Sequence, residues 1–243
     1  GQINIRDAEL EWHDETRAGA PPLKLTQVNL RLDNSGDRHR FGLLATPPAE
    51  LARQLELRGD VELPDIDQPA GASGELYVSL DNADLAIWQR WVDYPVDLPQ
   101  GRGAVRAWAN FDGATLNAVT GEVALSDVKL RLLPDLPQLD LVSLSGRISA
   151  EHLSRTRVSA TARQLQLLTR DGVRVRPTSI DLNWQAAADG RAGQGEISAS
   201  VLDLAALTRL SDFIPLPDPL RERLRDHAPH GRLTDLDAGW TGE

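Results

Sequence analysis

The feature that most constrains the fold is an alternation of apolar and polar side chains along most of the chain. Successive side chains of a β-strand point to opposite faces, so the alternation predicts strands with one apolar and one polar face. We count about a dozen such runs, which predicts a mostly β, antiparallel fold. Their apolar positions include Ile3, Ile5, Ala8, Leu10 and Trp12; Leu23, Leu25, Val28, Leu30 and Leu32; Phe41 and Leu43; Leu76, Val78 and Leu80; Val105, Ala107 and Ala109; Val123, Leu125, Val128, Leu130 and Leu132; Leu165 and Leu167; Ile180, Leu182 and Trp184; Ile197, Ala199 and Val201.

Two runs carry the same interruption. Residues 25–28 (Leu-Thr-Gln-Val) and 125–128 (Leu-Ser-Asp-Val) each insert one extra polar residue before the alternation resumes. An extra residue predicts a β-bulge, which bends a strand; the alternative is a tight turn between two short strands. Residues 33–37, 112–113, 171–172 and 189–190 have the Asp/Asn-Gly chemistry of hairpin turns, and residues 64–74 are expected to form a loop.

Helical spacing of apolar residues is confined to short segments. Helices are predicted over 84–92, with Leu85, Trp88 and Trp91 on one face, and over 204–213, with Leu204, Leu207 and Leu210. Aspartates precede both segments and can cap them. Residues 219–227 form a third candidate and residues 49–55 a weaker fourth.

The first two helices lie in matching surroundings. Each follows a strand and precedes a proline-rich crossing, a glycine, and a strand carrying Trp108 or Trp240. This predicts repeat units over about residues 1–100 and 101–230, with the next unit starting at about 231. The alternative is coincidence between two amphipathic helices.

Composition excludes several classes of function. The 26 basic residues are scattered among 36 acidic ones, for a net charge of −10, which disfavours binding to nucleic acid or to an anionic membrane surface. The absence of cysteine removes disulfides and thiolate chemistry. No run approaches the roughly 18 apolar residues of a membrane-spanning helix. The chain starts at Gly1 and holds no methionine, which suggests a piece of a longer protein.

No arrangement of residues predicts catalysis, a cofactor or a metal. His227 and His230 lie near Asp226, but Pro229 between them breaks the helical geometry that would bring them to one ion. No sequence has the spacing of a nucleophile elbow. Trp12, Trp108 and Trp184 are interpreted as members of the apolar faces of their strands. We therefore expect the chain not to be an enzyme.

A few short helices cannot cover the apolar face of so many strands. That face must pack on a second sheet, as in a sandwich, or stay open to bind something apolar. The alternation by itself favours the sandwich.

A resemblance to a known family bears on this choice. The run from Leu10 to Leu32, the segment from Gly74 through Trp88 and Trp91 to Gly103, residues 203–207 and the stretch from Pro229 to Trp240 are similar to the YhdP family, of the AsmA-like group that includes TamB. The resemblance covers nearly the whole chain. Its motifs are structural, so it carries over no catalytic residue.

The resemblance implies the periplasmic part of a protein anchored in the inner membrane of a Gram-negative bacterium. This chain would be an N-terminal portion of that periplasmic body. It would form one segment, residues 1–243, of a longer, elongated and strongly twisted antiparallel sheet, curved into an open, repeating groove with a few crossing helices. Such a groove would move phospholipid between the inner and outer membranes. Its partners would be phospholipid acyl chains, adjoining segments of the same chain and other envelope proteins.

The residues predicted to line the groove are those in apolar phase. They are Leu30, Leu32, Leu43, Val78, Val105, Leu125, Leu130, Leu167, Leu182 and Val201, with Leu85, Trp88, Trp91, Leu204, Leu207 and Leu210 on the crossing helices. The alternative function is a structural β-sandwich module that contacts other cell-envelope proteins.

Overall fold

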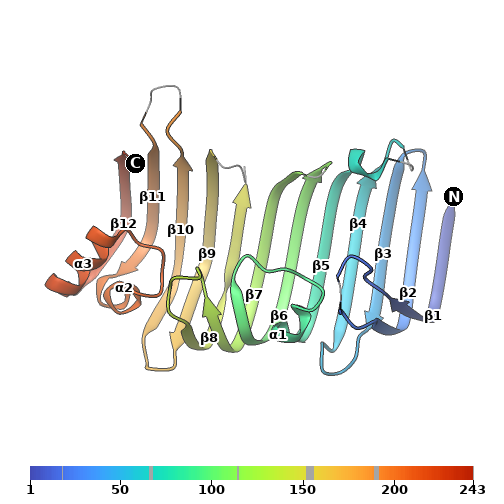
Figure 1. The fold of residues 1–243 in the computed structure, drawn as a ribbon, viewed down its shortest axis with the longest axis horizontal. Coiled ribbons are helices and arrows are strands. Elements are labelled where there is room, and N and C mark those ends of the chain that lie inside the picture. Colours follow the sequence, from blue (N-terminus) through green and yellow to red (C-terminus); the bar gives the residue numbers. More distant parts are fainter. Residues whose placement is uncertain (18, 66–67, 114, 152–155, 189–191, 243) are drawn as a thin grey trace. The chain divides into compact units, whose positions relative to one another are not determined.

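The strands follow one another in an antiparallel meander (Figure 1). The structure, a computed structural model, describes residues 1–17, 19–65, 68–113, 115–151, 156–188 and 192–242. Twelve strands form one sheet in the order of the chain, with β1 and β12 as the two ends of that order. The expectation of a mostly β, antiparallel, unclosed sheet is confirmed. The two-sheet sandwich is wrong for the described strands, because all belong to one sheet.

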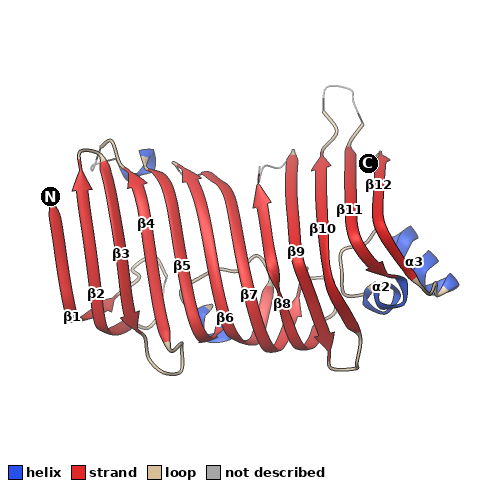
Figure 2. Cartoon of the chain, turned by 180° about the vertical axis from the view of Figure 1, so that it is seen from behind, coloured by secondary structure: helices blue, strands red, loops and turns tan. Residues whose placement is uncertain are grey.

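The strands are long and the helices short, as Figure 2 shows. The strands are β1 (Gln2–Trp12), β2 (Leu23–Ser35), β3 (Arg38–Thr46), β4 (Gln54–Glu62), β5 (Ser73–Asp84), β6 (Asp97–Asp112), β7 (Thr115–Arg131), β8 (Leu139–Glu151), β9 (Arg157–Thr169), β10 (Arg174–Gln185), β11 (Gln194–Asp203) and β12 (Arg232–Thr241). The helices are α1 (Leu85–Trp88), α2 (Leu204–Leu210) and α3 (Asp218–His227), with a 3-10 turn at Pro69–Gly71.

The chain divides into two compact units, each described below by itself. Unit 1 is Gly1–Asp93 with Arg102–Val123, and unit 2 is Tyr94–Gly101 with Ala124–Glu243. The division falls inside β6 and β7. The repeat units expected from the sequence, 1–100 and 101–230, remain a prediction.

Both predicted bulges lie inside continuous strands. Gln27 in β2 and Asp127 in β7 each have a left-handed φ of 50°. The β2–β3 register shifts between Thr26 and Asn29. The bulge is therefore confirmed over the alternative of a tight turn. Left-handed residues recur within other strands at Asp7, Asn82, Gln164 and Asp235.

The bulges keep the apolar side chains on one face. Because the extra residue resets the alternation, Leu25 and Val28 are both buried although three positions apart. Leu125 and Val128 are buried in the same way around Asp127.

The turns agree with the sequence where they can be described. Residues 35–38 and 169–174 contain tight connections with positive φ at Gly36 and Gly172. Gly113, with a φ of 59°, follows β6. The turn expected at residues 189–190 lies outside the described residues.

Three of the four predicted helices form. α1 is shorter than the expected 84–92 because the chain continues as turns from Gln89. The helix expected over 49–55 is wrong. There the chain makes a turn in which the Leu51 amide donates to the Pro48 carbonyl at 2.8 Å, and it enters β4 at Gln54.

α1 and α2 each begin at an aspartate that caps the helix and also forms an ion pair. Asp84 accepts a hydrogen bond from the Ile87 amide at the start of α1 and lies 2.9 Å from Arg102 on β6. Asp203 accepts from the Ala206 amide at the start of α2, and Arg232 on β12 lies 3.7 Å from it. In each unit one aspartate thus caps a helix and pairs with the strand that follows the crossing.

The face opposite the apolar one carries cross-strand ion pairs. On unit 1, Arg38 donates from Nε and Nη2 to the two carboxylate oxygens of Asp60, both at 2.6 Å. These hydrogen bonds, with the positive charge of Arg38, lower the pKa of Asp60. On unit 2, Arg163 pairs with Asp181 at 2.5 Å. Exposed pairs of this kind contribute little to stability and favour solubility.

The lowered pKa of Asp60 makes its contribution to stability depend on pH. A carboxylate whose pKa is lower in the folded chain stabilises the fold above the unfolded value and loses that effect as pH falls through the folded value. Asp60→Asn is therefore expected to lower the urea midpoint of unfolding by a small amount at pH 7. The difference from wild type should narrow below about pH 4. Glu50→Gln, in an exposed connection, is the control. A difference that grows in acid would contradict the assignment.

The left-handed conformation at Asn82 can be tested with two substitutions. Asn82 is exposed and has a φ of 52°. A β-branched residue should cost about 1–2 kcal/mol there, whereas glycine adopts this conformation freely. We expect Asn82→Val to lower the urea midpoint of unfolding and Asn82→Gly to leave it nearly unchanged. Ser79→Val, in the extended part of β5, controls for the valine; an equal loss there would argue against the bulge.

Candidate functional site

The apolar face of unit 1 is built from rows of side chains in register across β1–β6. One row is Ile5, Leu30, Leu43, Leu57, Val78 and Ala107, and the next is Ile3, Leu32, Phe41, Gly59, Leu76 and Ala109. Residues directly opposite each other in an antiparallel sheet share a face, so these rows form one continuous apolar surface.

The apolar face of unit 2 has the same construction across β8–β12. Its rows are Ala150, Ala160, Leu182, Ile197 and Ala238, then Ile148, Ala162, Ile180, Ala199 and Leu236. A third row, Val158, Trp184, Gly195 and Trp240, lies nearer the ends of β10 and β12.

Burial falls steadily along the apolar face of unit 1. Leu25 and Val28, next to the crossing segments, are 4% and 2% exposed. Leu30 and Leu32 further along β2 are half-buried, and the neighbouring Ile3 is 49% exposed. Unit 2 shows the same trend, from buried Leu141 and Val173 to Trp184 at 37% exposed. One end of each face is therefore covered and the other is open.

The structure places the predicted lining residues on these two apolar faces. In unit 1 they are Leu30, Leu32, Leu43, Val78 and Val105, all half-buried. In unit 2, Leu167, Leu182 and Val201 lie on the apolar face of β9–β11, and Leu125 and Leu130 lie on β7. Leu125 differs from the others because it is fully buried at the covered end. That these residues line a lipid path remains a proposal.

Two tryptophans close the covered end of unit 1. Trp88 of α1 and Trp91 just after it are buried, with ring centroids 5.8 Å apart in an edge-on contact. The Trp88 indole donates to the Leu51 carbonyl and the Trp91 indole to the Pro21 carbonyl, each at 3.0 Å. The indoles thus connect the β1–β2 and β3–β4 segments to α1, of which Leu85 is also buried.

The covered end of unit 2 is formed by α2 and the neighbouring turns. Leu210 is buried there, while Leu204 and Leu207 are half-buried. Arg209 of α2 donates to the Asp171 carboxylate at 2.5 Å in the β9–β10 turn. Hydrogen bonds from the Thr169 hydroxyl and from Arg209 lower the pKa of Asp171, so this carboxylate is held ionised as a link between helix and turn.

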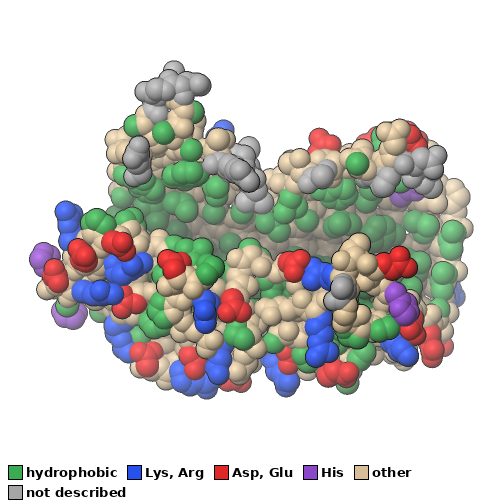
Figure 3. Space-filling view, in the orientation of Figure 1, with side chains coloured by type: hydrophobic (Ala, Val, Ile, Leu, Met, Phe, Trp, Pro, Cys, Tyr) green, Lys and Arg blue, Asp and Glu red, His purple; other side chains and the backbone are tan. Residues whose placement is uncertain are grey.

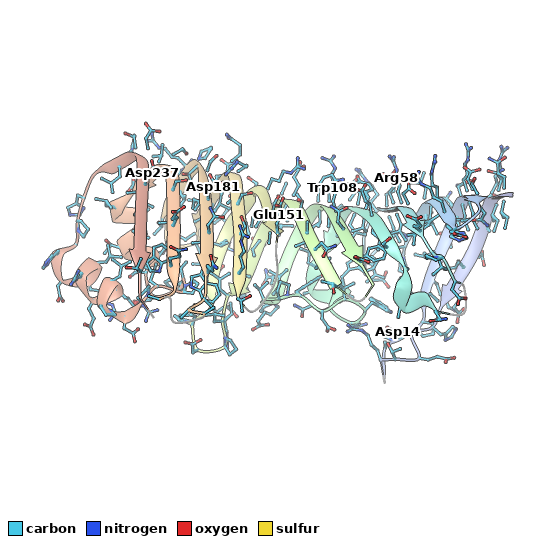
Figure 4. All side chains as sticks on the ribbon, turned by 90° about the horizontal axis from the view of Figure 1, so that it is seen from above. Asp14, Arg58, Trp108, Glu151, Asp181 and Asp237 are labelled. Carbon is cyan, nitrogen blue, oxygen red and sulfur yellow. The ribbon has the colours of Figure 1, made fainter. Side chains whose placement is uncertain are left out.

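Figures 3 and 4 show how the two faces differ. In Figure 3 hydrophobic side chains line a hollow over the sheet of each unit, bordered below by the charged surface of the crossing segments. In Figure 4 Arg58 and Trp108 project from the side of unit 1's sheet opposite to Asp14 of the β1–β2 connection. The crossing segment therefore lies on the apolar side, and the polar face remains open to solvent.

The interpretation of Trp108 as an apolar-face residue is wrong. Its cross-strand partner is Tyr77, which shares the polar face with Arg58. The Tyr77 and Trp108 rings are 5.3 Å apart, and the Arg58 guanidinium lies 5.6 Å from the Tyr77 ring centre. Trp108 falls between Ala107 and Ala109, so strict alternation puts it on the other face. Trp12 and Trp184 do lie on the apolar face.

Two pairs of residues on the apolar faces were missed at the sequence level. A side-chain carbon added at Gly59 would collide with the Phe41 ring, and one added at Gly195 would lie 2.6 Å from Cη2 of Trp240. Each aromatic ring therefore lies over a glycine of the adjacent strand. Only the strand register brings these residues together; the one available signal was a glycine in apolar phase.

Polar chemistry on these faces is sparse. Among the described residues, no group of three or more histidine and carboxylate side chains is placed to hold a metal ion. No helix in the part of the chain that the structure describes has the length and apolar character needed to cross a bilayer. The apolar faces can hold an apolar ligand by contact and exclusion of water.

Comparison with known proteins identifies the family. No curated protein matches this chain, and no solved structure does. The model of the YhdP protein family matches residues 1–243. A family model that spans every residue establishes the relationship: the chain belongs to the YhdP family.

Proposed function

We propose that this chain carries the acyl chains of phospholipids on the apolar faces of its units. It would do so as a periplasmic segment of a bridge, anchored in the inner membrane, that moves phospholipid between the inner and outer membranes. Membership of the YhdP family associates the chain with AsmA-like lipid transport, and this family is not known as an enzyme family.

The observation that carries the proposal is the half-open apolar face. In each unit, rows of Leu, Ile, Val and Ala run across the strands, and the crossing segments cover only one end of them. Exposed apolar area of this extent is rare in a protein without an apolar partner. The partner must be long and apolar, because the rows continue from strand to strand.

The energetics suit transport. Keeping an acyl chain out of water is worth about 0.8 kcal/mol per CH₂, or on the order of ten kcal/mol for a whole chain. A bilayer at either end offers the same benefit, so the net affinity of the protein for a lipid can be small. Such a balance lets lipid move along the face without a deep energy minimum.

The distribution of charged side chains favours a position of the lipid headgroup outside the apolar face. Most of the ion pairs, such as Arg38 with Asp60 on unit 1, lie on the polar face or on the crossing segments. A charged headgroup that entered the apolar face would lose its hydration without a partner, which is costly. The acyl chains would therefore lie on the face and the headgroup would remain in water.

A substitution at Leu182 tests the proposal. Leu182 is half-buried in the middle of β10, between Ala160 and Ile197, so an arginine there can reach solvent without unfolding the chain. Leu182→Arg should reduce the phospholipid that mass spectrometry finds in solvent extracts of the purified chain by about tenfold, the equivalent of two lost CH₂ contacts. Leu125 is unsuitable, because it is buried and a charge there would destabilise the fold.

The control is the same substitution on the opposite face. Ser198→Arg lies on β11 across from Asp181, where an arginine finds an opposite charge. It should leave the lipid content unchanged. Wild-type chain that carries no phospholipid, or equal lipid in both variants, would favour a structural module contacting envelope proteins instead.

A further inference from the structure

The apolar face of each unit contains an aromatic ring that extends over a glycine of the adjacent strand. In unit 1, Phe41 of β3 is directly opposite Gly59 of β4, and in unit 2, Trp240 of β12 is opposite Gly195 of β11. Side chains of strands normally stand roughly perpendicular to the sheet. These two rings instead extend over the backbone of the next strand, and both glycines are buried beneath them.

The glycines are required for this arrangement. At Gly59, a side-chain carbon would collide with the Phe41 ring and would also lie 3.1 Å from Leu76 Cδ2. At Gly195, it would overlap the Trp240 ring at Cζ2 and Cε2. Both obstructions are rings held by strand pairing, so a larger residue must push the ring away from the sheet.

Gly195 has a second aromatic neighbour besides Trp240. Its second cross-strand neighbour is Trp184, so the glycine sits between two tryptophans in one row. Trp184 and Trp240 are 37% and 43% exposed, so both indoles already face the open side of the apolar surface. A side chain at Gly195 would take the space that the Trp240 ring occupies.

Aromatic side chains on the polar face pack differently from those on the apolar face. There Tyr77 and Trp108 contact each other as a tilted pair, without a glycine beneath either ring. Rings that extend over a glycine therefore occur on the faces that would contact lipid. Stabilisation of the sheet alone does not explain this difference, because cross-strand aromatic pairs stabilise either face.

We propose that Gly59 and Gly195 set the clearance of the lipid path, meaning the free height above the apolar face through which an acyl chain can pass. This rests on the proposed function. By letting Phe41 and Trp240 extend over the adjacent strand, the glycines keep these two rings low on the surface, so a chain passes them without meeting an upright ring. A flexible unbranched chain is the ligand that such a level, nonpolar surface admits.

Alanine at each glycine tests the clearance. Gly195→Ala and Gly59→Ala should each reduce the phospholipid taken up from vesicles of phosphatidylethanolamine and phosphatidylglycerol by about tenfold, as if two CH₂ contacts were lost. The matched controls are Gly239→Ala on β12, whose added carbon meets nothing closer than 3.7 Å, and Gly42→Ala on β3, which has open space within 4 Å. Both controls should take up lipid as wild type does.

Removal of the ring separates a blocked path from a damaged fold. If the displaced ring is the obstacle, Gly195→Ala with Trp240→Ala and Gly59→Ala with Phe41→Ala should restore uptake to within about twofold of wild type. Trp240→Ala alone should bind at least as much lipid as wild type. Uptake is expressed per folded molecule, with the urea midpoint of each variant measured in parallel.

Each outcome has one meaning. Wild-type chain that takes up no phospholipid overturns the proposed function, and the clearance with it. Uptake by wild type with equal uptake by Gly195→Ala and Gly59→Ala overturns the clearance alone. Loss in the single variants that ring removal does not restore also overturns it, because the obstacle is then not the ring.

Discussion

The structure depends on keeping apolar side chains in phase across a long meander. One face of each strand must be apolar throughout, and a slip of one residue would turn those side chains to solvent. The bulges at Gln27 and Asp127 bend their strands yet return Val28 and Val128 to the apolar side. In each strand the bulge residue therefore both bends the strand and keeps the apolar side chains on one face.

The crossing segments cover one end of the apolar face and leave the other end open. Trp88 and Trp91 bury their rings against the strand ends and donate to loop carbonyls, so backbone groups of the crossings stay paired. The helices are too short to reach the other end of the strands, where Ile3 and Trp240 remain exposed. A protein that needed only a stable core would gain by covering them.

The sequence predicted what is encoded locally. Alternation identified the strands, the extra residues at Gln27 and Asp127 identified bulges, and aspartates marked the starts of α1 and α2. Trp108 was assigned to the wrong face although its place between Ala107 and Ala109 already indicates the polar one. By contrast, neither Phe41 over Gly59 nor Trp240 over Gly195 can be predicted without the strand register. The helix expected over 49–55 does not form. Its last residues belong to β4, because pairing with β3 and β5 outweighs a weak helical preference.

The scarcity of polar groups on the apolar faces has a mechanistic consequence. A binding site that recognised a headgroup through hydrogen bonds would hold each lipid at one place, since desolvated polar pairs are costly to separate. Apolar contacts depend on buried area and have no preferred direction. As one CH₂ leaves a row, the next can enter it, so the free energy changes little with position. A surface of aliphatic rows, levelled by glycines under its largest rings, is therefore suited to passage more than to storage.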